Sequence, residues 1–571
     1  MARNIGVNFN GKHIVHPGAY SKINTDSMGL SGSNTTRTIV FVGSSQGGQP
    51  GVVNWFSNPT DMKRYLRGGD LAVAGELAYS PSGEGAGAST VGFLRVEDAK
   101  KGSLTKQGLV AKAKDWGDHT NKIQIKLEDG TLAGSKKLTT YFWVDNIMET
   151  YDNIGPIFNV QYTGTAAYAG LTVEVDTNGA GKTLIVKTGA DEATATETLH
   201  YDLTSGQYAS IASIVTDINE HVGFSANIVA AGNKNIETTG LDAVAKQDIK
   251  TAPYAVKAFK ADLLYQTRYG QLVDLSFTTG GTFPDDFSFT YLTGGENGVA
   301  PSSWADKFNL LYGEGIDMLV PLTPTESIHS EAARFIEFQS TEERNEMIGL
   351  YGGGPGEKVD DAIGRAVNLN SSRAVVAYPG ITRTLSDGTT LTFPSYFTAA
   401  IIAGKIAGVA VGEPVTLDYV NLIGLEKVCN ADEIKRLIEG GVTAIEYVRQ
   451  RNRKGFRIAQ GITTYQVDEN PVYREISVRL MADDLVQELR ERLESKFAGG
   501  KGLATTPALI KNEVQSFLDD KVRDEWIVDY RRTVDVKMTG NRVEVNFEAQ
   551  PVEAINFILI GCNFYRESIS A

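Results

Sequence analysis

The chain has 571 residues, of which 42% are hydrophobic and 22% are charged, and its formal net charge is -14. This length is sufficient for several domains. The acidic balance argues against general nucleic-acid binding and against docking to anionic lipid, because both need a basic face. The two cysteines, Cys429 and Cys562, are far apart in sequence, which excludes a disulfide framework and a cysteine-based zinc site.

The first 20 residues have an extended, polar pattern without a helical period. Val7 and Phe9 alternate with polar residues, and Ile14 follows a few positions later. This segment is either a frayed terminus or an arm that pairs with another subunit. No apolar secretory segment is present, so we expect a protein that is made in the cytoplasm.

Residues 21–99 are predicted to form the first part of an α/β core. A continuous apolar strand is expected at residues 39–42, followed by two helices within residues 60–79 and a strand at 91–96. This order of strand, helix and strand favours a parallel crossover unit.

Residues 100–255 have a different composition, because Thr, Gly, Asp and Asn become frequent and short alternating runs dominate. One amphipathic helix is expected between residues 208 and 222. We interpret residues 100–255 as a β-rich domain inserted into the core.

Residues 256–430 return to alternating strands and helices, as in a doubly wound layer. Strands are expected at residues 272–277, 315–321 and 374–377, and Thr323 with Pro324 predicts a helix start. The apolar run at residues 396–411 is too short to span a membrane and contains Lys405, so it predicts a buried helix.

Residues 431–554 are predicted to be an α+β C-terminal domain, and residues 555–571 a strand-like arm. Two long amphipathic helices are followed by a hairpin, because apolar and charged residues alternate on both sides of Gly540 and Asn541. A hairpin alone is marginal, so its sheet needs further strands or a packing surface. The residues proposed for strand exchange between subunits are Val7, Phe9, Ile14, Val534, Val536, Val543, Val545, Phe547, Ile555, Phe557 and Leu559.

No catalytic, cofactor-binding or metal-binding residue is predicted. Residues 176–183 nearly match a phosphate-binding loop, but Asp176 replaces the first glycine and the following residues have a strand pattern, which favours a hairpin turn. Residues 352–358 lack the Gly-Lys-Ser/Thr ending of that motif, which favours a loop between a strand and a helix. His13 and His16 have no third ligand nearby. A nucleotide-binding α/β enzyme therefore remains only a minor alternative.

The densest basic cluster consists of Arg449, Arg451, Arg453 and Lys454. It is either a solvated hairpin tip or a contact with an acidic surface, and the absence of interleaved aromatic residues disfavours nucleic acid.

Several motifs, taken in order, resemble those of contractile bacteriophage tail sheath proteins. Residues 16–20 resemble the family's Pro-Gly-Val-Tyr opening, and residues 292–298 resemble its Gly-Gly-x-x-Gly signature. Residues 38–43 resemble its first core strand, residues 395–414 its glycine- and alanine-rich helix, and residues 550–555 its C-terminal end. The match covers most of the chain except about residues 100–255.

The resemblance implies a structural subunit that is not an enzyme and needs no cofactor. It implies stacked hexameric rings around a tail tube, with the C-terminal domain innermost and its small sheet completed by arms of neighbouring subunits. Contraction would drive the tube through the host envelope during genome ejection.

The expected partners are other copies of the chain, the tail tube protein, and the baseplate and tail terminator proteins. No nucleic acid and no direct membrane insertion are expected. The basic cluster would contact the tube. The expected location is the virion tail, assembled in the host cytoplasm, and a sheath of a bacterial pyocin-like injection system is an alternative.

Overall fold

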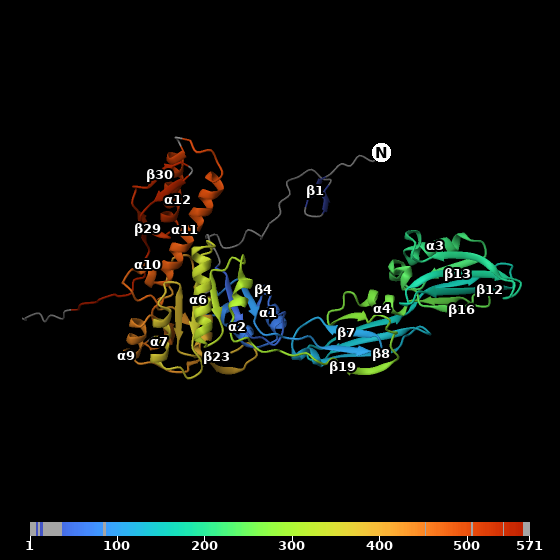
Figure 1. Cartoon of the computed structure of the whole chain (residues 1–571). Helices are drawn as coiled ribbons and strands as arrows, with labels where there is room; N and C mark the ends of the chain where they lie inside the picture. Colours follow the sequence, from blue (N-terminus) through green and yellow to red (C-terminus); the bar gives the residue numbers. More distant parts are fainter. Residues whose placement is uncertain are drawn as a thin grey trace, which may run out of the picture.

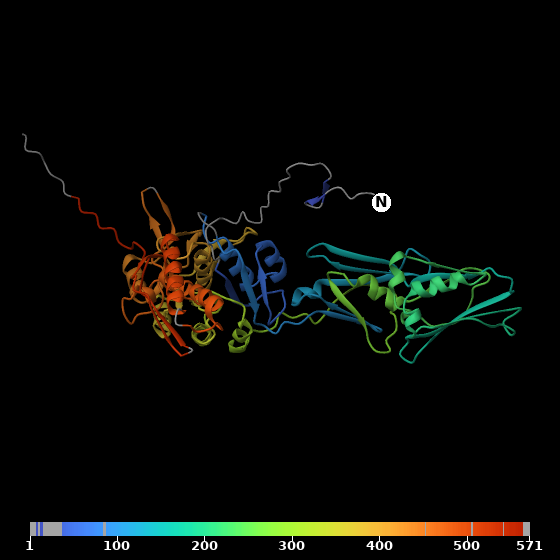
Figure 2. The same cartoon turned by 90° about the horizontal axis from the view of Figure 1, so that it is seen from above.

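The computed structural model describes residues 37–83, 87–451, 453–503, 506–540 and 542–562, together with the backbone of strands β1 (Val7–Phe9) and β2 (Lys12–Ile14). Figures 1 and 2 show a central α/β core, a C-terminal unit packed on one side of it, and a long β-rich projection extending from the other side. The prediction of a multidomain, mixed α/β chain is confirmed.

A nine-stranded sheet organises the core, in the order β25-β28-β27-β22-β21-β20-β3-β5-β4. The six strands from β27 to β5 are parallel. Strand β28 pairs antiparallel with β27, and the edge strands β25 and β4 pair antiparallel with β28 and β5. Every residue of β3, β5, β20, β21 and β22 is buried, as expected for parallel strands covered on both faces. The strands are β3 (Ile39–Gly43), β4 (Val53–Phe56), β5 (Val91–Arg95), β20 (Met318–Pro321), β21 (Ile348–Gly352), β22 (Ala374–Tyr378), β25 (Tyr419–Val420), β27 (Val442–Arg449) and β28 (Lys454–Ile458).

Helices cover both faces of this sheet. One face packs against α1 (Pro59–Leu66), α2 (Asp70–Tyr79) and α8 (Ser395–Ala407). The other face packs against α5 (Ala305–Phe308), α6 (Glu326–Thr341), α7 (Val359–Leu369) and α9 (Ala431–Glu439). The apolar run that contains Lys405 is indeed a buried helix, α8, and Lys405 forms an ion pair with Asp418 at 2.9 Å.

The projection contains two hydrophobic clusters, one nearer the core and one at the far end (Figure 1). The nearer unit combines the sheets β10-β9-β8-β19 and β18-β7-β6 with α4, and the far unit combines β15-β11-β17 and β14-β13-β12-β16 with α3. Their elements are β6 (Ser103–Lys106), β7 (Leu109–Ala113), β8 (Ile123–Asp129), β9 (Lys136–Phe142), β10 (Ile147–Ile154), β11 (Pro156–Tyr162), β12 (Tyr168–Val175), β13 (Gly181–Gly189), β14 (Thr196–Asp202), α3 (Ile211–Glu220), β15 (Phe224–Ile228), β16 (Val244–Asp248), β17 (Tyr254–Lys257), α4 (Phe259–Thr267), β18 (Val273–Phe277) and β19 (Phe287–Tyr291).

The projection extends beyond residue 255, where the sequence predicts a return to the core. Strand β18 pairs with β7 and β19 pairs with β8, so both belong to the sheets of the nearer unit. The chain rejoins the core sheet only at β20. The predicted strand at residues 272–277 exists, but its partner lies in the projection and not in the core.

The predicted boundary at residue 431 also differs from the structure. Strand β27 pairs in parallel with β22, and β28 pairs with β27, so both belong to the core sheet. The C-terminal unit contains the second half of α11 (Ile476–Phe497) and the elements α12 (Thr506–Arg523), β29 (Ile527–Tyr530), β30 (Asp535–Thr539), β31 (Arg542–Asn546) and β32 (Ala549–Pro551). The short elements α10 (Pro471–Arg474), β23 (Ile381–Thr384), β24 (Thr390–Phe393) and β26 (Gly424–Leu425) complete the description.

Helix α11 joins the C-terminal unit to the core. Ile476 and Leu480 pack in a core cluster, whereas Leu485 and Leu489 pack in the cluster of the C-terminal unit. Ion pairs reinforce the junction: Asp483 accepts two hydrogen bonds from Arg373, at 2.8 and 3.1 Å. The helix therefore links the two units as one continuous rod.

The predicted helix start at Thr323 is two residues early, because α6 begins at Glu326 with Thr325 as its N-cap. The Thr323 hydroxyl instead accepts a hydrogen bond from the backbone N–H of Thr325 at 3.3 Å.

Candidate subunit interface

The C-terminal unit leaves the edges of two small sheets open within the described part of the chain. Strands β29 and β32 form one two-stranded sheet, and the hairpin β30–β31 forms another. The predicted hairpin is confirmed, with Val536 opposite Val545 and Met538 opposite Val543. Unpaired strand edges present rows of free N–H and C=O groups, which can bind a further strand.

The apolar face of the hairpin packs on its own subunit. Val534 is 2% exposed, and Val536, Val545 and Phe547 pack against the cluster formed by α11 and α12. Only Val543 is exposed, at 37%. The structure therefore divides the hairpin residues proposed for strand exchange: their side chains hold the C-terminal unit together, and their backbone edges are open.

The tail after β32 has the opposite character, because it is apolar and exposed. Ile555, Phe557 and Leu559 are 80%, 84% and 95% exposed, and Ile558 and Ile560 are similarly exposed. The side-chain amide of Asn556 donates to Glu475 at 2.8 Å, which attaches the tail near the start of α11. Such a run of exposed apolar side chains is costly in water and favours burial against a partner.

Other predicted positions lie outside the described residues. These are residues 563–571 of the C-terminal arm, most of residues 1–20, and the side chains of Val7, Phe9 and Ile14. The backbone pairing of β1 with β2 places Val7 opposite Ile14 and Phe9 opposite Lys12.

A groove of about 990 Å³ lies beside the hairpin. It is bounded by the end of α11, the glycine-rich turn after it, the start of α12, and β30 and β31. Apolar residues contribute much of its lining, among them Phe497, Ile510, Met538 and Val543. Sequence periodicity did not indicate this groove, because its walls come from three separated parts of the chain, namely Arg344, residues 490–510 and residues 538–545.

The predicted basic cluster lies at the tip of the β27–β28 hairpin, at one edge of the core sheet and not in the C-terminal unit. Aromatic residues that are not adjacent in sequence surround it. The Tyr447 and Phe456 rings are 5.1 Å apart, and the Arg453 guanidinium lies 3.7 Å from the centre of the Tyr419 ring. No aromatic residue stands between these cations in the sequence, but strand pairing brings the flanking rings of Tyr447 and Phe456 together beside them.

The phosphate-loop look-alikes are structural turns. Asp176 accepts hydrogen bonds from the backbone N–H groups of Asn178 and Ala180, at 2.8 and 2.9 Å, and closes the β12–β13 hairpin. In the second loop, the Gly353 N–H donates to the Ser395 hydroxyl at 2.6 Å, and Ser395 donates to Glu357 at 3.0 Å. A Cβ at Gly353 would meet the Glu357 carboxylate within about 2 Å, so this carboxylate already fills the space that a phosphate would need.

One buried cluster combines residue types that occur in hydrolase active sites. It joins Ser395 and Glu357 to Arg365 and His329. His329 is 1% exposed, and burial together with the nearby charge of Arg365 lowers its pKa to about 3. Because the histidine contacts Arg365 and the Thr323 carbonyl but not the serine, it cannot serve as the base of that hydroxyl.

Within the described ranges, no group of three or more His, Cys, Asp or Glu side chains could hold a metal ion. Across the same residues, no helix has both the length and the apolar character that crossing a membrane requires.

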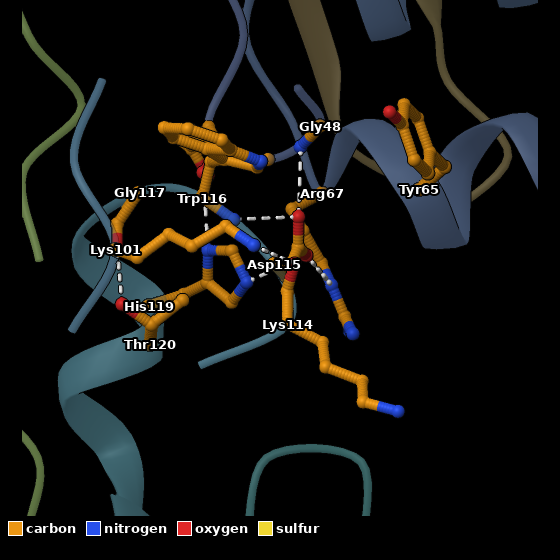
Figure 3. A network of polar contacts seen from close by, with 12 residues as sticks. Gly48, Tyr65, Arg67, Lys101, Lys114, Asp115, Trp116, Gly117, His119 and Thr120 are labelled. Carbon is orange, nitrogen blue, oxygen red and sulfur yellow. Dashed lines mark hydrogen bonds and ion pairs between the residues drawn. The ribbon is translucent and has the colours of Figure 1, made fainter. Parts of the chain in front are cut away.

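The projection is fixed to the core where the chain leaves and re-enters it. Figure 3 shows Asp115 at the centre of this junction, in contact with Gly48 and Arg67 of the core and with His119 of the projection. Burial opposes ionisation of Asp115, but His119 and the N–H groups of Trp116 and Gly48 hold its pKa below the ordinary value. The buried Arg95 donates to Asn297 at 2.9 Å and to Gly48 and Trp116 at 3.1 and 3.3 Å, so it ties both crossing segments to the core.

Comparison with known proteins identifies the family. Family models match residues 299–464 as a phage tail sheath protein central domain and residues 468–564 as a phage tail sheath C-terminal domain. A tail sheath protein of Bacillus phage SP01 is 39% identical over 565 residues, which are 98% of this chain and 97% of that protein. The chain belongs to the phage tail sheath family.

Further sheath proteins agree over the full length. The tail sheath protein of Staphylococcus phage Twort is 32% identical over 597 residues and covers all of both chains. A crystal structure of a sheath tail protein from Desulfitobacterium hafniense has a TM-score of 0.57 at 14% identity, over 94% of this chain and 97% of that one, and so shares its fold. The resemblance inferred from the motifs is confirmed, and this sheath-family chain is a structural tail protein.

Proposed function

We propose that this sheath subunit polymerises around a tail tube and contracts, and that its two ends link it to neighbouring copies. The observation that carries the proposal is the exposed apolar tail that follows a hairpin with open edges. The tail is exposed to solvent and the hairpin edges are unpaired. When two copies meet, the tail of one copy can satisfy the backbone N–H and C=O groups of the other copy's hairpin, and the tail can bury its apolar side chains there.

The proposed contact combines backbone and side-chain recognition. The tail of one copy would add a strand beside the hairpin of a neighbour, where it gains backbone hydrogen bonds. Its apolar side chains, Ile555, Phe557 and Leu559, would fill the groove lined by Phe497 and Met538. The N-terminal arm would act in the same way on another copy. Linked subunits could then move as rigid bodies without separating.

We further propose the arrangement of the other parts. The C-terminal unit would face the tube, and the projection, which is fixed at the Asp115 junction, would face outward. Hexameric rings, assembly in the host cytoplasm, and contacts with the tube, baseplate and terminator proteins belong to this proposal. A contracted state more stable than the extended one would supply the driving force, without nucleotide hydrolysis.

The tail is tested by changing its chemistry while keeping its length. Replacing Phe557 and Leu559 with serine should leave the subunit folded and soluble, because these exposed side chains contribute nothing to the monomer's own core. The variant should no longer form filaments, because the tail can no longer bury apolar side chains in a neighbour. Glu553→Gln is the matched control, since it changes an exposed polar residue of the same segment. Electron microscopy and sedimentation velocity measure filament length and mass. Filaments of normal length from the double serine variant would contradict strand exchange.

The same test applies at the other end. Deleting residues 1–20 should also leave unpolymerised subunits with an unchanged melting temperature. A phage tail and a pyocin-like injection device would give the same result, because both use the same polymer.

A further inference from the structure

Two surfaces of the core carry exposed aromatic side chains among charges of opposite sign. The basic surface is the tip of the β27–β28 hairpin, with Arg449, Arg451, Arg453 and Lys454 around Tyr447, which is 42% exposed. The first four residues of β27 are buried and the next four are half-buried or exposed, so the hairpin tip extends beyond the packed layers.

The acidic surface lies on α5, the turn after it, and α6. Leu310, Tyr312 and Phe338 are 44%, 45% and 43% exposed, and the rings of Tyr312 and Phe338 meet edge to face at 6.2 Å. Residues 306–344 contain eight acidic and three basic residues. Glu337, Glu342 and Glu343 are exposed beside Phe338, whereas the basic residues of the segment are Lys307, Arg334 and Arg344.

These surfaces lie on different parts of the core, the basic one at an edge of the sheet and the acidic one on a face of it. The basic tip continues β27 and β28, next to the edge strand β25. The α6 part of the acidic surface packs over the central strands β20 and β21. Its other part, the turn after α5, reaches the edge strand β4, because the indole N–H of Trp55 donates to Glu314 at 2.9 Å. Figure 2 shows the β4 side of the core beside the projection and the β27–β28 side away from it.

We propose that the basic hairpin tip of one copy docks on the acidic α5–α6 surface of the next copy. This inference rests on the proposed function, because it needs a polymer. A contact between two different surfaces of the same chain is head-to-tail, so it repeats from copy to copy and generates a ring or a helix. The aromatic side chains supply the buried centre of such a contact, and the charges select its orientation.

The hairpin tip has two possible acidic partners, the tube and a second copy of the chain. The family resemblance implies a contact with the tube, but the sequence and structure of this chain do not define the surface of the tube protein. The α5–α6 surface is acidic, carries exposed aromatic residues that match those of the hairpin, and is present on every copy. A contact with a second copy is therefore the inference that the structure supports, and tube binding becomes an alternative outcome of the test.

Charge reversal and charge exchange test the contact. The variant R449E/R451E and the variant E337K/E342K should each raise the protein concentration needed for polymerisation by about tenfold or more, because like charges then face each other. The chain that carries all four substitutions should polymerise like the wild type, since each copy again presents opposite signs. K182E/K187E, on exposed positions of the projection, is the matched control and should have no effect.

A second measurement locates the contact directly. In chains whose Cys429 and Cys562 are replaced by serine, Tyr447→Cys and Phe338→Cys are placed on separate copies, mixed, and oxidised after polymerisation. A disulfide-linked dimer of the two chains is expected, and its absence in intact polymers would overturn the inference.

The outcomes separate this inference from the proposed function. If the wild type never polymerises, both are wrong. If the wild type and both reversal variants polymerise alike, or the fourfold exchange does not restore polymerisation, only the hairpin contact is wrong. Loss of binding to purified tubes by R449E/R451E with normal self-assembly would assign the hairpin to the tube.

Discussion

The packing of α8 against α2 predicts that one substitution has opposite effects at two glycines. Gly404 lies inside α8, and a Cβ there would approach backbone atoms of Ala78 in α2 at 2.5 Å. Gly364 lies inside α7, and a Cβ there would have nothing within 4 Å outside its own helix. Glycine is needed at the first position for close approach of two helices, and at the second position it is only a poor helix former.

The expected magnitudes follow from two terms. Replacing an interior helical glycine with alanine stabilises a helix by about 1 kcal/mol. Gly364→Ala should therefore raise the free energy of unfolding by roughly that amount. At Gly404 the same gain is opposed by overpacking, which costs about 1–3 kcal/mol when a backbone must move. The two variants should differ by about 1–3 kcal/mol, with Gly404→Ala the less stable.

Calorimetry of unpolymerised subunits measures the transition of the core, and hydrogen exchange in α2 and α8 shows where the change acts. The serine variant of the tail is a suitable background, because it removes assembly from the measurement. If Gly404→Ala were as stabilising as Gly364→Ala, the contact between α2 and α8 would not explain this glycine, and the argument would be refuted.

Three further predictions concern ionisable side chains in the core and at the junction with the projection. Arg95→Met should loosen the projection, because three backbone carbonyls lose their donor and Glu97 loses its partner at 3.1 Å; small-angle scattering and hydrogen exchange near residue 297 would detect this. Asp115 has a lowered pKa, so its contribution to stability is present above the ordinary carboxyl pKa of about 4 and is lost as the pH falls further. Hydrogen exchange at the junction should therefore become faster at low pH, and Asp115→Asn should remove this pH dependence. His329 has a pKa of about 3 in the folded core and stays neutral there, whereas the unfolded chain takes up a proton on this residue below about pH 6.5. The free energy of unfolding should therefore fall as the pH is lowered from 6.5 towards 3. His329→Asn should flatten this fall in a pH series of melting curves.

Local patterns predicted the elements of this chain well where one face or one apolar run decides the structure. The continuous apolar strand at residues 39–42 is β3, the apolar run around Lys405 is the buried α8, and the alternation on both sides of Gly540 is the hairpin β30–β31. In each case burial and turn chemistry act within a few residues, so the sequence carries the whole signal.

Domain boundaries could not be predicted in the same way, because they depend on which strand is the partner. The residues of β18 were predicted as a strand of the core, and the residues of β27 were assigned to the C-terminal domain. Strand β18 pairs with β7, about 160 positions earlier, and β27 pairs with β22 of the core. Alternation indicates that a strand has one buried face, but it does not identify the neighbouring strand. Long-range strand pairing therefore explains why the predicted boundaries after residues 255 and 430 differ from those in the structure.

The candidate interface also depends on long-range packing that the sequence does not show. The sequence analysis assigned the hairpin and tail residues to one role, strand exchange, but the structure separates residues that pack within the subunit from residues that are exposed. The apolar residues of the hairpin and of the tail look alike in sequence, yet Val534 is buried in its own subunit whereas Leu559 is almost fully exposed. Substituting Val534 should therefore destabilise the C-terminal unit, whereas substituting Leu559 should leave the monomer intact and weaken the polymer. In the strand exchange that we propose, the hairpin would contribute its open backbone edge and not its side chains, so one small sheet could hold its own unit together and still receive a strand from a neighbour.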